Sequence, residues 1–323
     1  MAPLPDISRH LKEKEGFCHP NWEAIGGQIE KSVAKWDWNA AWEAAARQWI
    51  GRLCDQLGDD YQLHETANFM IVSEAPKRVM TDACNFFEKA LTQILSALSG
   101  VALDEGYGKH VVLMFSLPEH YYKYISYFDP AGEHPTSGGI YLPGEGYAHF
   151  AFPTTDYSSY RAVLVHELTH GCLAHLTLPA WLNEAMAMRM EDAVSESNSL
   201  NLDREIHERH MSHWNSRTIQ QFWSGESWEI PGDSFDLSYT LAQVIWRKIE
   251  VDLGAPRKAV LEFISSAAEN DAGEAACNGI FGVSLGELVA DFLGDGDWSP
   301  KPYMWRKNKQ KKRAARSICL CGL

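Results

Sequence analysis

The spacing of apolar residues predicts a helix between residues 163 and 176. Apolar side chains recur there at intervals of about three and four residues, as on one face of an α-helix. They stand at positions 163, 164, 168, 172, 173 and 176. Ser158 and Ser159 are suitable N-cap residues before this run, and Leu178-Pro179 ends it because proline disfavours helical conformation at the preceding residue. We therefore expect a largely apolar helix of about 18 residues.

Helical patterns recur over much of the remaining chain. The other predicted helices span residues 39–57, 74–98, 118–128, 235–251, 258–268 and 284–292. Ser284 and Glu287 stand three residues apart, in the register of a capping box at the start of the last of these. The chain after residue 184 is therefore expected to be mainly helical.

Shorter apolar segments predict a small mixed β-sheet. Residues 61–73 alternate enough to form one strand, and residues 110–117 are apolar enough for burial on both faces. Residues 139–142 and 147–152 predict a strand pair around the turn at 143–146. This order predicts an α+β fold. Its expected segments are a helical N-terminal extension (1–60), an α/β lobe (61–178), a helical lobe (179–297) and a basic tail (298–323).

The predicted helix at 163–176 contains the pentad His166-Glu167-Leu168-Thr169-His170, an H-E-x-x-H pattern. Two histidines four residues apart lie one helical turn apart on the same face, so both imidazoles can reach one ion. Glu167 lies beside them. This is the arrangement of a zinc hydrolase, in which two nitrogen ligands accompany a carboxylate that takes a proton from an activated water.

A hydrolytic zinc site normally has a third protein ligand. The metzincin pattern would place a glycine and a histidine after the pentad, but Leu173 and Leu176 occupy those positions, and His175 faces elsewhere on the helix. Glu184 is the better candidate. It opens a second helix rich in Ala and Met, both good helix formers, directly after the stretch 179–183.

These motifs resemble those of a known family. HELTH followed by LPAWLNEAMA is similar to the H-E-[LF]-T-H … P-x-W-L-x-E-G pattern of the peptidase MA-like gluzincins, distant relatives of thermolysin. The resemblance implies a zincin-like metallopeptidase fold with one zinc ion, ligands His166, His170 and Glu184, and Glu167 as general base. The family usually has Gly after the third ligand, where this chain has Ala185, and we expect packing to adjust.

The resemblance extends more weakly over residues 61–295 and implies further roles. A comparable helix in the family places a tyrosine near the metal, which makes Tyr239 the candidate that hydrogen-bonds the developing oxyanion; the alternative is a core aromatic. Glu191 or Asp192 is a candidate partner of a ligand histidine. Residues 147–152 or their hairpin partner are expected to line the substrate cleft by strand addition, unless they form an ordinary edge hairpin.

Charge is distributed unevenly along the chain. The chain of 323 residues has a formal net charge of −14, although the segment 301–323 carries eight Lys or Arg and no acidic residue. The acidic part of the chain before this segment should repel nucleic acid. Contact with nucleic acid is therefore expected, if anywhere, through the basic tail. The alternative role of the tail is that of an extended or disordered terminus that aids solubility. The expected partner is a peptide or protein substrate.

Several features favour the cytoplasm. The N-terminus lacks an apolar signal region, no stretch reaches 18 apolar residues, and the seven cysteines are odd in number and scattered, which favours a reducing compartment.

Cys18-His19 has no matching pair for a second metal site. The tryptophans of 36–49 are interpreted as anchors of their helix. His207, His210 and His213 suggest a solvated surface rather than a second zinc site.

The predicted activity is zinc-dependent peptide hydrolysis, in which Glu167 accepts a proton from the attacking water and passes it to the leaving amine. A catalytically silent binding protein on a peptidase fold is the alternative from another class, and hydrolysis of a non-peptide amide is a third. Intact Glu167 speaks against the binding protein, since a site without catalysis needs no general base.

Overall fold

A mixed five-stranded β-sheet forms the centre of the first half of the chain. The computed structural model describes residues 6–128, 138–144, 146–154, 160–196 and 198–305. The strand order is β3-β4-β5-β7-β6. The bounds are β3 Gln62–Glu65, β4 Phe69–Ser73, β5 His110–Phe115, β6 Ile140–Leu142 and β7 His149–Pro153. The fold is therefore α+β, as the order of sequence patterns predicts.

The apolar run predicted as a strand at residues 110–117 forms the central strand β5. It pairs in parallel with β4 on one side and β7 on the other, whereas β3 and β6 are antiparallel edge strands. Helices pack on both faces of such a parallel core, and five of the six residues of β5 are buried. The predicted burial on both faces is confirmed.

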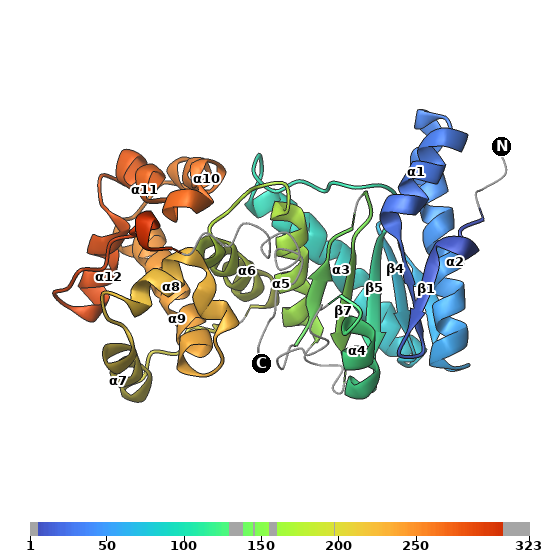
Figure 1. The fold of residues 1–323 in the computed structure, drawn as a ribbon, viewed down its shortest axis with the longest axis horizontal. Helices are drawn as coiled ribbons and strands as arrows, with labels where there is room; N and C mark the ends of the chain where they lie inside the picture. The colour runs from blue at the N-terminus through green and yellow to red at the C-terminus, as the bar shows by residue number, and fades with distance from the viewer. Residues whose placement is uncertain (1–5, 129–137, 145, 155–159, 197, 306–323) are drawn as a thin grey trace. The chain divides into compact units, whose positions relative to one another are not determined.

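Apolar helices cover the two faces of this sheet (Figure 1). On one face, α3 (Lys77–Ala97) and α5 (Tyr160–Leu173) pack through the ring contacts Phe69–Phe87 and Phe87–Tyr160. On the other face lie α1 (Trp22–Ser32), α2 (Trp38–Leu57) and a hairpin of β1 (Leu11–Lys14) and β2 (Phe17–Pro20). The helix α4 (Pro118–Ile125) also joins this second core.

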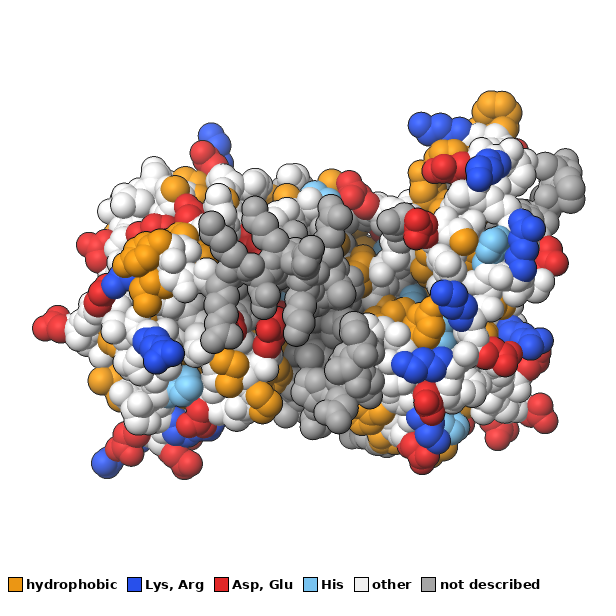
Figure 2. Space-filling view, in the orientation of Figure 1, with side chains coloured by type: hydrophobic (Ala, Val, Ile, Leu, Met, Phe, Trp, Pro, Cys, Tyr) orange, Lys and Arg blue, Asp and Glu red, His pale blue; other side chains and the backbone are white. Residues whose placement is uncertain are grey.

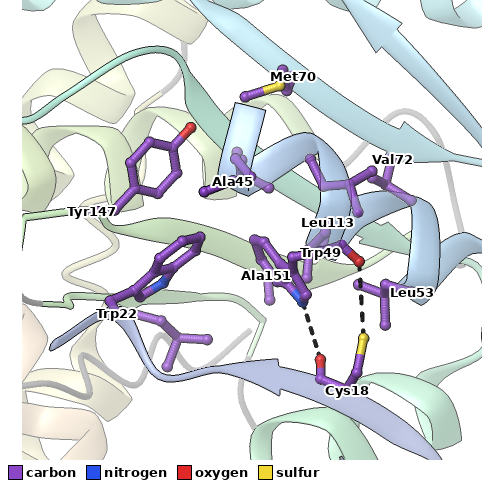
Figure 3. Packing of buried hydrophobic residues seen from close by; sticks show 14 of the residues in the cluster. Cys18, Trp22, Ala45, Trp49, Leu53, Met70, Val72, Leu113, Tyr147 and Ala151 are labelled. Atoms are coloured by element: carbon purple, nitrogen blue, oxygen red, sulfur yellow. Dashed lines mark hydrogen bonds between the residues drawn. The ribbon is translucent and has the colours of Figure 1, made fainter. Parts of the chain in front are cut away.

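The N-terminal core is built around buried tryptophans (Figure 3). The indole nitrogen of Trp49 donates to the carbonyl of Cys18 at 3.0 Å, and the Cys18 thiol donates to the carbonyl of Trp49 at 3.9 Å. The ring of Trp42 stacks on Tyr147 at 5.8 Å. The interpretation of tryptophans as anchors therefore holds for Trp42 and Trp49, but it fails for Trp36, which is 86% exposed.

Two sequence predictions missed a turn. The segment 1–60 is not purely helical: Glu15 and Gly16 have φ values of 53° and 88° and close the β1–β2 hairpin. The segment 61–73 forms two strands rather than one, because Thr66 and Phe69 exchange hydrogen bonds that close a turn between β3 and β4. Both turns are short, so neither interrupts the apolar pattern enough to be recognised.

The chain after α5 is helical, as predicted. Its elements are α6 (Ala180–Ser195), α7 (Arg204–His213), α8 (Thr218–Ser224), α9 (Asp233–Arg247), a π-helix (Lys248–Asp252), α10 (Arg257–Ser266), α11 (Glu274–Phe281) and α12 (Leu285–Leu293). Trp181, Trp223 and Phe263 are fully buried among them. The capping box of Ser284 and Glu287 is confirmed at the start of α12. The sequence patterns did not reveal α11.

The described residues cluster into two units. One contains those of Met1–Gln93 and Asp104–Gly171, and the other those of Ile94–Leu103 and Cys172–Lys312. These limits differ from the predicted segments, since the N-terminal helices share a core with the sheet. Residues 298–305, assigned above to the tail, contact α8: the Trp223 indole donates to the carbonyl of Trp298 at 2.7 Å. The rest of the predicted tail lies outside the described residues.

The surface carries charges of both signs. On the face shown in Figure 2, acidic and basic side chains of the described residues are interspersed. In the described part of the chain, no single helix combines the length and apolar character of a membrane span, and α11 with α12 meets those criteria only as a pair bent by 89°.

Candidate metal centre

The helix α5 carries the H-E-x-x-H pentad near its middle. It spans Tyr160–Leu173 and is therefore shorter than the 18 residues expected, since a turn from the Leu176 amide to the Leu173 carbonyl follows it at once. The predicted N-caps Ser158 and Ser159 lie outside the described residues. Residues 174–179 then lead to α6, whose first helical residue, Ala180, directly follows Pro179.

His166, His170 and Glu184 come together as the sequence predicts. One donor atom from each lies within 4.8 Å of the other two, and the side chains are buried, with 4%, 4% and 6% of their surface exposed. The two imidazole rings are 4.8 Å apart and inclined at 69°, as expected for histidines one turn apart on a helix. These three buried residues can hold a metal ion.

The donor set fits a divalent ion such as zinc. Zinc accepts imidazole nitrogen and carboxylate oxygen, and a tetrahedral ion with bonds of about 2.0–2.2 Å keeps its ligand atoms about 3.3–3.6 Å apart. The three donor atoms lie within 4.8 Å of one another, an upper limit that includes this spacing. Three protein donors leave one tetrahedral position for water or substrate, which is the pattern of catalytic rather than structural zinc sites.

Glu167 is fully buried on α5 next to His166. Its Cγ lies close to Gly139, the residue before β6: a Cβ on Gly139 would stand 3.5 Å from it. Thr169 is also buried, and its hydroxyl donates to the carbonyl of Val165 one turn earlier at 2.7 Å. The hydroxyl inside the pentad is therefore satisfied within α5.

Two glycines allow α5 to lie close to the β6–β7 hairpin. A Cβ on Gly171 would meet Phe150 of β7 at 3.2 Å and Tyr141 of β6 at 3.4 Å, and Gly139 approaches α5 at its other end. The two contacts place β6 along α5. The sequence analysis missed both glycines, because a close approach between two elements leaves no local pattern.

The structure separates the two strands proposed to line a cleft. Because β7 pairs with β5 on one side and β6 on the other, it has no open edge. Among the described residues β6 pairs with β7 alone, so β6 is the strand at the sheet edge. Strand addition can therefore occur at residues 140–142 but not at 149–153.

Tyr239 lies half-buried on α9, which packs against α6, the helix of Glu184. Its ring makes edge contacts with Phe235 at 5.3 Å and Trp228 at 6.2 Å. These contacts show how the ring is held. They do not decide between the oxyanion role and the core role, so the oxyanion role remains a prediction.

Asp192 has a structural partner that the sequence did not reveal. Its carboxylate accepts hydrogen bonds from the Ser199 amide at 2.8 Å and the Ser199 hydroxyl at 3.2 Å, which ties the end of α6 to the following chain. Both Glu191 and Asp192 remain predictions as partners of a ligand histidine.

The histidine cluster of α7 is partly internal. His210 is fully buried, accepts a hydrogen bond from the Trp214 indole at 2.9 Å and packs on Phe292, so the prediction of a solvated surface is wrong for this residue. Burial lowers its pKa to about 4. In the described ranges, His166, His170 and Glu184 form the only group of three or more His, Cys, Asp or Glu with converging donors.

No model of a known protein family matches the chain, and no curated protein sequence matches it. The chemistry of the site must therefore be inferred from the side chains themselves.

Proposed function

We propose that the protein is a zinc-dependent peptidase of the gluzincin type, with a zincin-like fold and one zinc ion held by His166, His170 and Glu184. The observation that carries the proposal is the convergence of these three buried donors, with a buried glutamate adjacent to the first of them. A purely structural ion has no need of that glutamate, whereas metal-assisted hydrolysis needs a base beside the attacking water.

The chain supplies the acid–base chemistry of the reaction. When bound, zinc acts as a Lewis acid that polarises a carbonyl and lowers the pKa of a water ligand toward neutrality. Glu167 accepts the proton of the attacking water and then delivers it to the leaving amine. Tyr239 is the candidate donor to the oxygen on which negative charge develops.

The edge strand β6 supports a peptide as the substrate. No strand of the described residues pairs with the outer side of residues 140–142, so an extended peptide can pair there through main-chain hydrogen bonds. β6 follows α5 past the site, as the glycine contacts indicate. Such pairing recognises any extended backbone, so it favours a peptide or protein over a small amide.

The test combines metal analysis with a cleavage assay. We expect purified protein to contain about one zinc per chain and to cleave a mixed peptide library until a chelator is added. Glu167→Gln should retain zinc and lose at least about 100-fold in kcat, because the base is removed while the ligands stay. Stoichiometric zinc with no cleavage would favour the binding protein, and activity only on non-peptide amides would favour the third alternative.

A further inference from the structure

Gly139, the residue before β6, lies close to α5. A Cβ built on this residue would stand 2.3 Å from Cγ1 of Val163 and 3.3 Å from Cβ of Phe152. The first separation is far below the contact distance of about 3.5–4.0 Å between carbon atoms. Any other residue at position 139 must therefore move the strand, the helix or both.

Backbone conformation does not explain this glycine. The glycines with positive φ begin with Gly16 and Gly58 and do not include Gly139, so the backbone here would accept alanine. Val163 cannot readily turn aside either, because a β-branched side chain in a helix has one strongly preferred rotamer. The demand for glycine comes from the contact itself.

Glu167 lies one turn after Val163 on the same face of α5, and its Cγ lies 3.5 Å from the same Cβ position. The backbone of Gly139 thus borders the stem of the glutamate. If the strand were displaced from α5, space would open beside Cγ and the carboxylate would lose its fixed position.

We infer that Gly139 is a positioning residue for the general base: its missing side chain seats the backbone just before β6 against Glu167 and fixes the carboxylate beside the metal ligands. The inference rests on the proposed function. A misplacement of about 1 Å can cost about 100-fold in rate, so the contact matters even though Gly139 contributes no reactive group.

The experiment compares Gly139→Ala, Val163→Ala and the double variant with wild type. We expect Gly139→Ala to bind zinc stoichiometrically, to lose about 10- to 100-fold in kcat and to keep KM within about threefold. Val163→Ala removes the clashing methyl group and should restore the double variant to within about threefold of Val163→Ala alone. Gly51→Ala is the matched control, since no atom lies within 4 Å of a Cβ at Gly51, and its kcat should equal that of wild type.

Each outcome is decisive. If wild type shows no chelator-sensitive cleavage, the proposed function fails and this inference falls with it. If wild type cleaves and Gly139→Ala cleaves at the same rate, only this inference is overturned. If Gly139→Ala does not fold, the double variant decides: recovery of both fold and kcat supports the inference, and no recovery overturns it. A loss of zinc equal to the loss of kcat would also overturn it, because the ligands rather than the base would then have moved.

Discussion

Glu184 differs from the other two candidate ligands because a second helix supplies it. His166 and His170 are brought together by helical geometry alone, whereas Glu184 comes from α6. Glu184→Ala should therefore weaken zinc binding by more than about 100-fold, since even loss of an outer partner of a ligand costs 10- to 100-fold. Competition with a chromophoric chelator measures the affinity.

The matched control is Glu205→Ala, which removes an exposed glutamate of α7 and should leave zinc affinity unchanged. Equal zinc affinity in Glu184→Ala and wild type would remove Glu184 from the ligand set.

At the residue scale, the sequence could predict what depends on spacing within one helix. The pentad fixes the relation of His166, Glu167 and His170, and the motif around Glu184 adds the third donor. It could not predict Gly139, whose role depends on the 2.3 Å approach to Val163 from a different element. The hydrogen bond from the Ser199 amide to the Asp192 carboxylate depends likewise on the path of the chain after α6.

At the element scale, α2 shares a core with the sheet instead of forming part of a separate N-terminal extension. Trp49 is fully buried and donates to Cys18 of β2, whereas Trp36, in the 3-10 helix Lys35–Asp37 before α2, is 86% exposed. Trp49→Ala should lower the free energy of unfolding by about 3–5 kcal/mol, through the lost contacts and the cavity left behind. Urea denaturation followed by circular dichroism measures the change.

Trp36→Ala is the control for this substitution, because an exposed side chain contributes little to stability, and its effect should stay within about 0.5 kcal/mol. Equal effects of the two substitutions would show that α2 does not stabilise the sheet.

The predictability of the elements follows their length. Long helices such as α3 and α9 repeat the apolar period several times, so their positions are close to those predicted. The hairpin of β1 and β2 and the turn between β3 and β4 contain only a few residues each, and one misread turn merges two strands. The α+β class survives these errors because the order of the elements is unchanged.

At the scale of the whole molecule, a buried ion should contribute to stability. A ligand that binds only the folded chain stabilises it by about 4 kcal/mol at 1,000 times its dissociation constant. Chelation should therefore lower Tm by at least about 5 °C, measured by differential scanning calorimetry. In Glu184→Ala, whose zinc affinity should fall more than about 100-fold, the chelator should lower Tm by less than about half as much, and a chelator effect of full size in that variant would place the stabilising ion elsewhere.

The folded chain should also be sensitive to acid because of buried histidines, among them His19 on β2 and His149 on β7. His19 and His149 are 0% and 1% exposed, and the Tyr124 hydroxyl lies 2.7 Å from Nε2 of His149. Burial lowers the pKa of His19 to about 4, against an opposing effect of the Lys14 backbone. Burial, and secondarily the proximity of His19, lowers the pKa of His149 to about 3.

The direction in which stability changes with pH follows from proton binding. Between an unfolded pKa of about 6.5 and the folded values, the unfolded chain binds more protons, so stability is full above about pH 7 and falls as the pH drops toward 4. With His210, which is also buried and has its pKa lowered to about 4, three such histidines give a slope of about 4.1 kcal/mol per pH unit. His19→Phe should remove about a third of that slope. Urea denaturation at pH 7, 6 and 5, with chelator present to exclude metal release, measures it; an unchanged slope would mean that His19 does not titrate as its burial requires.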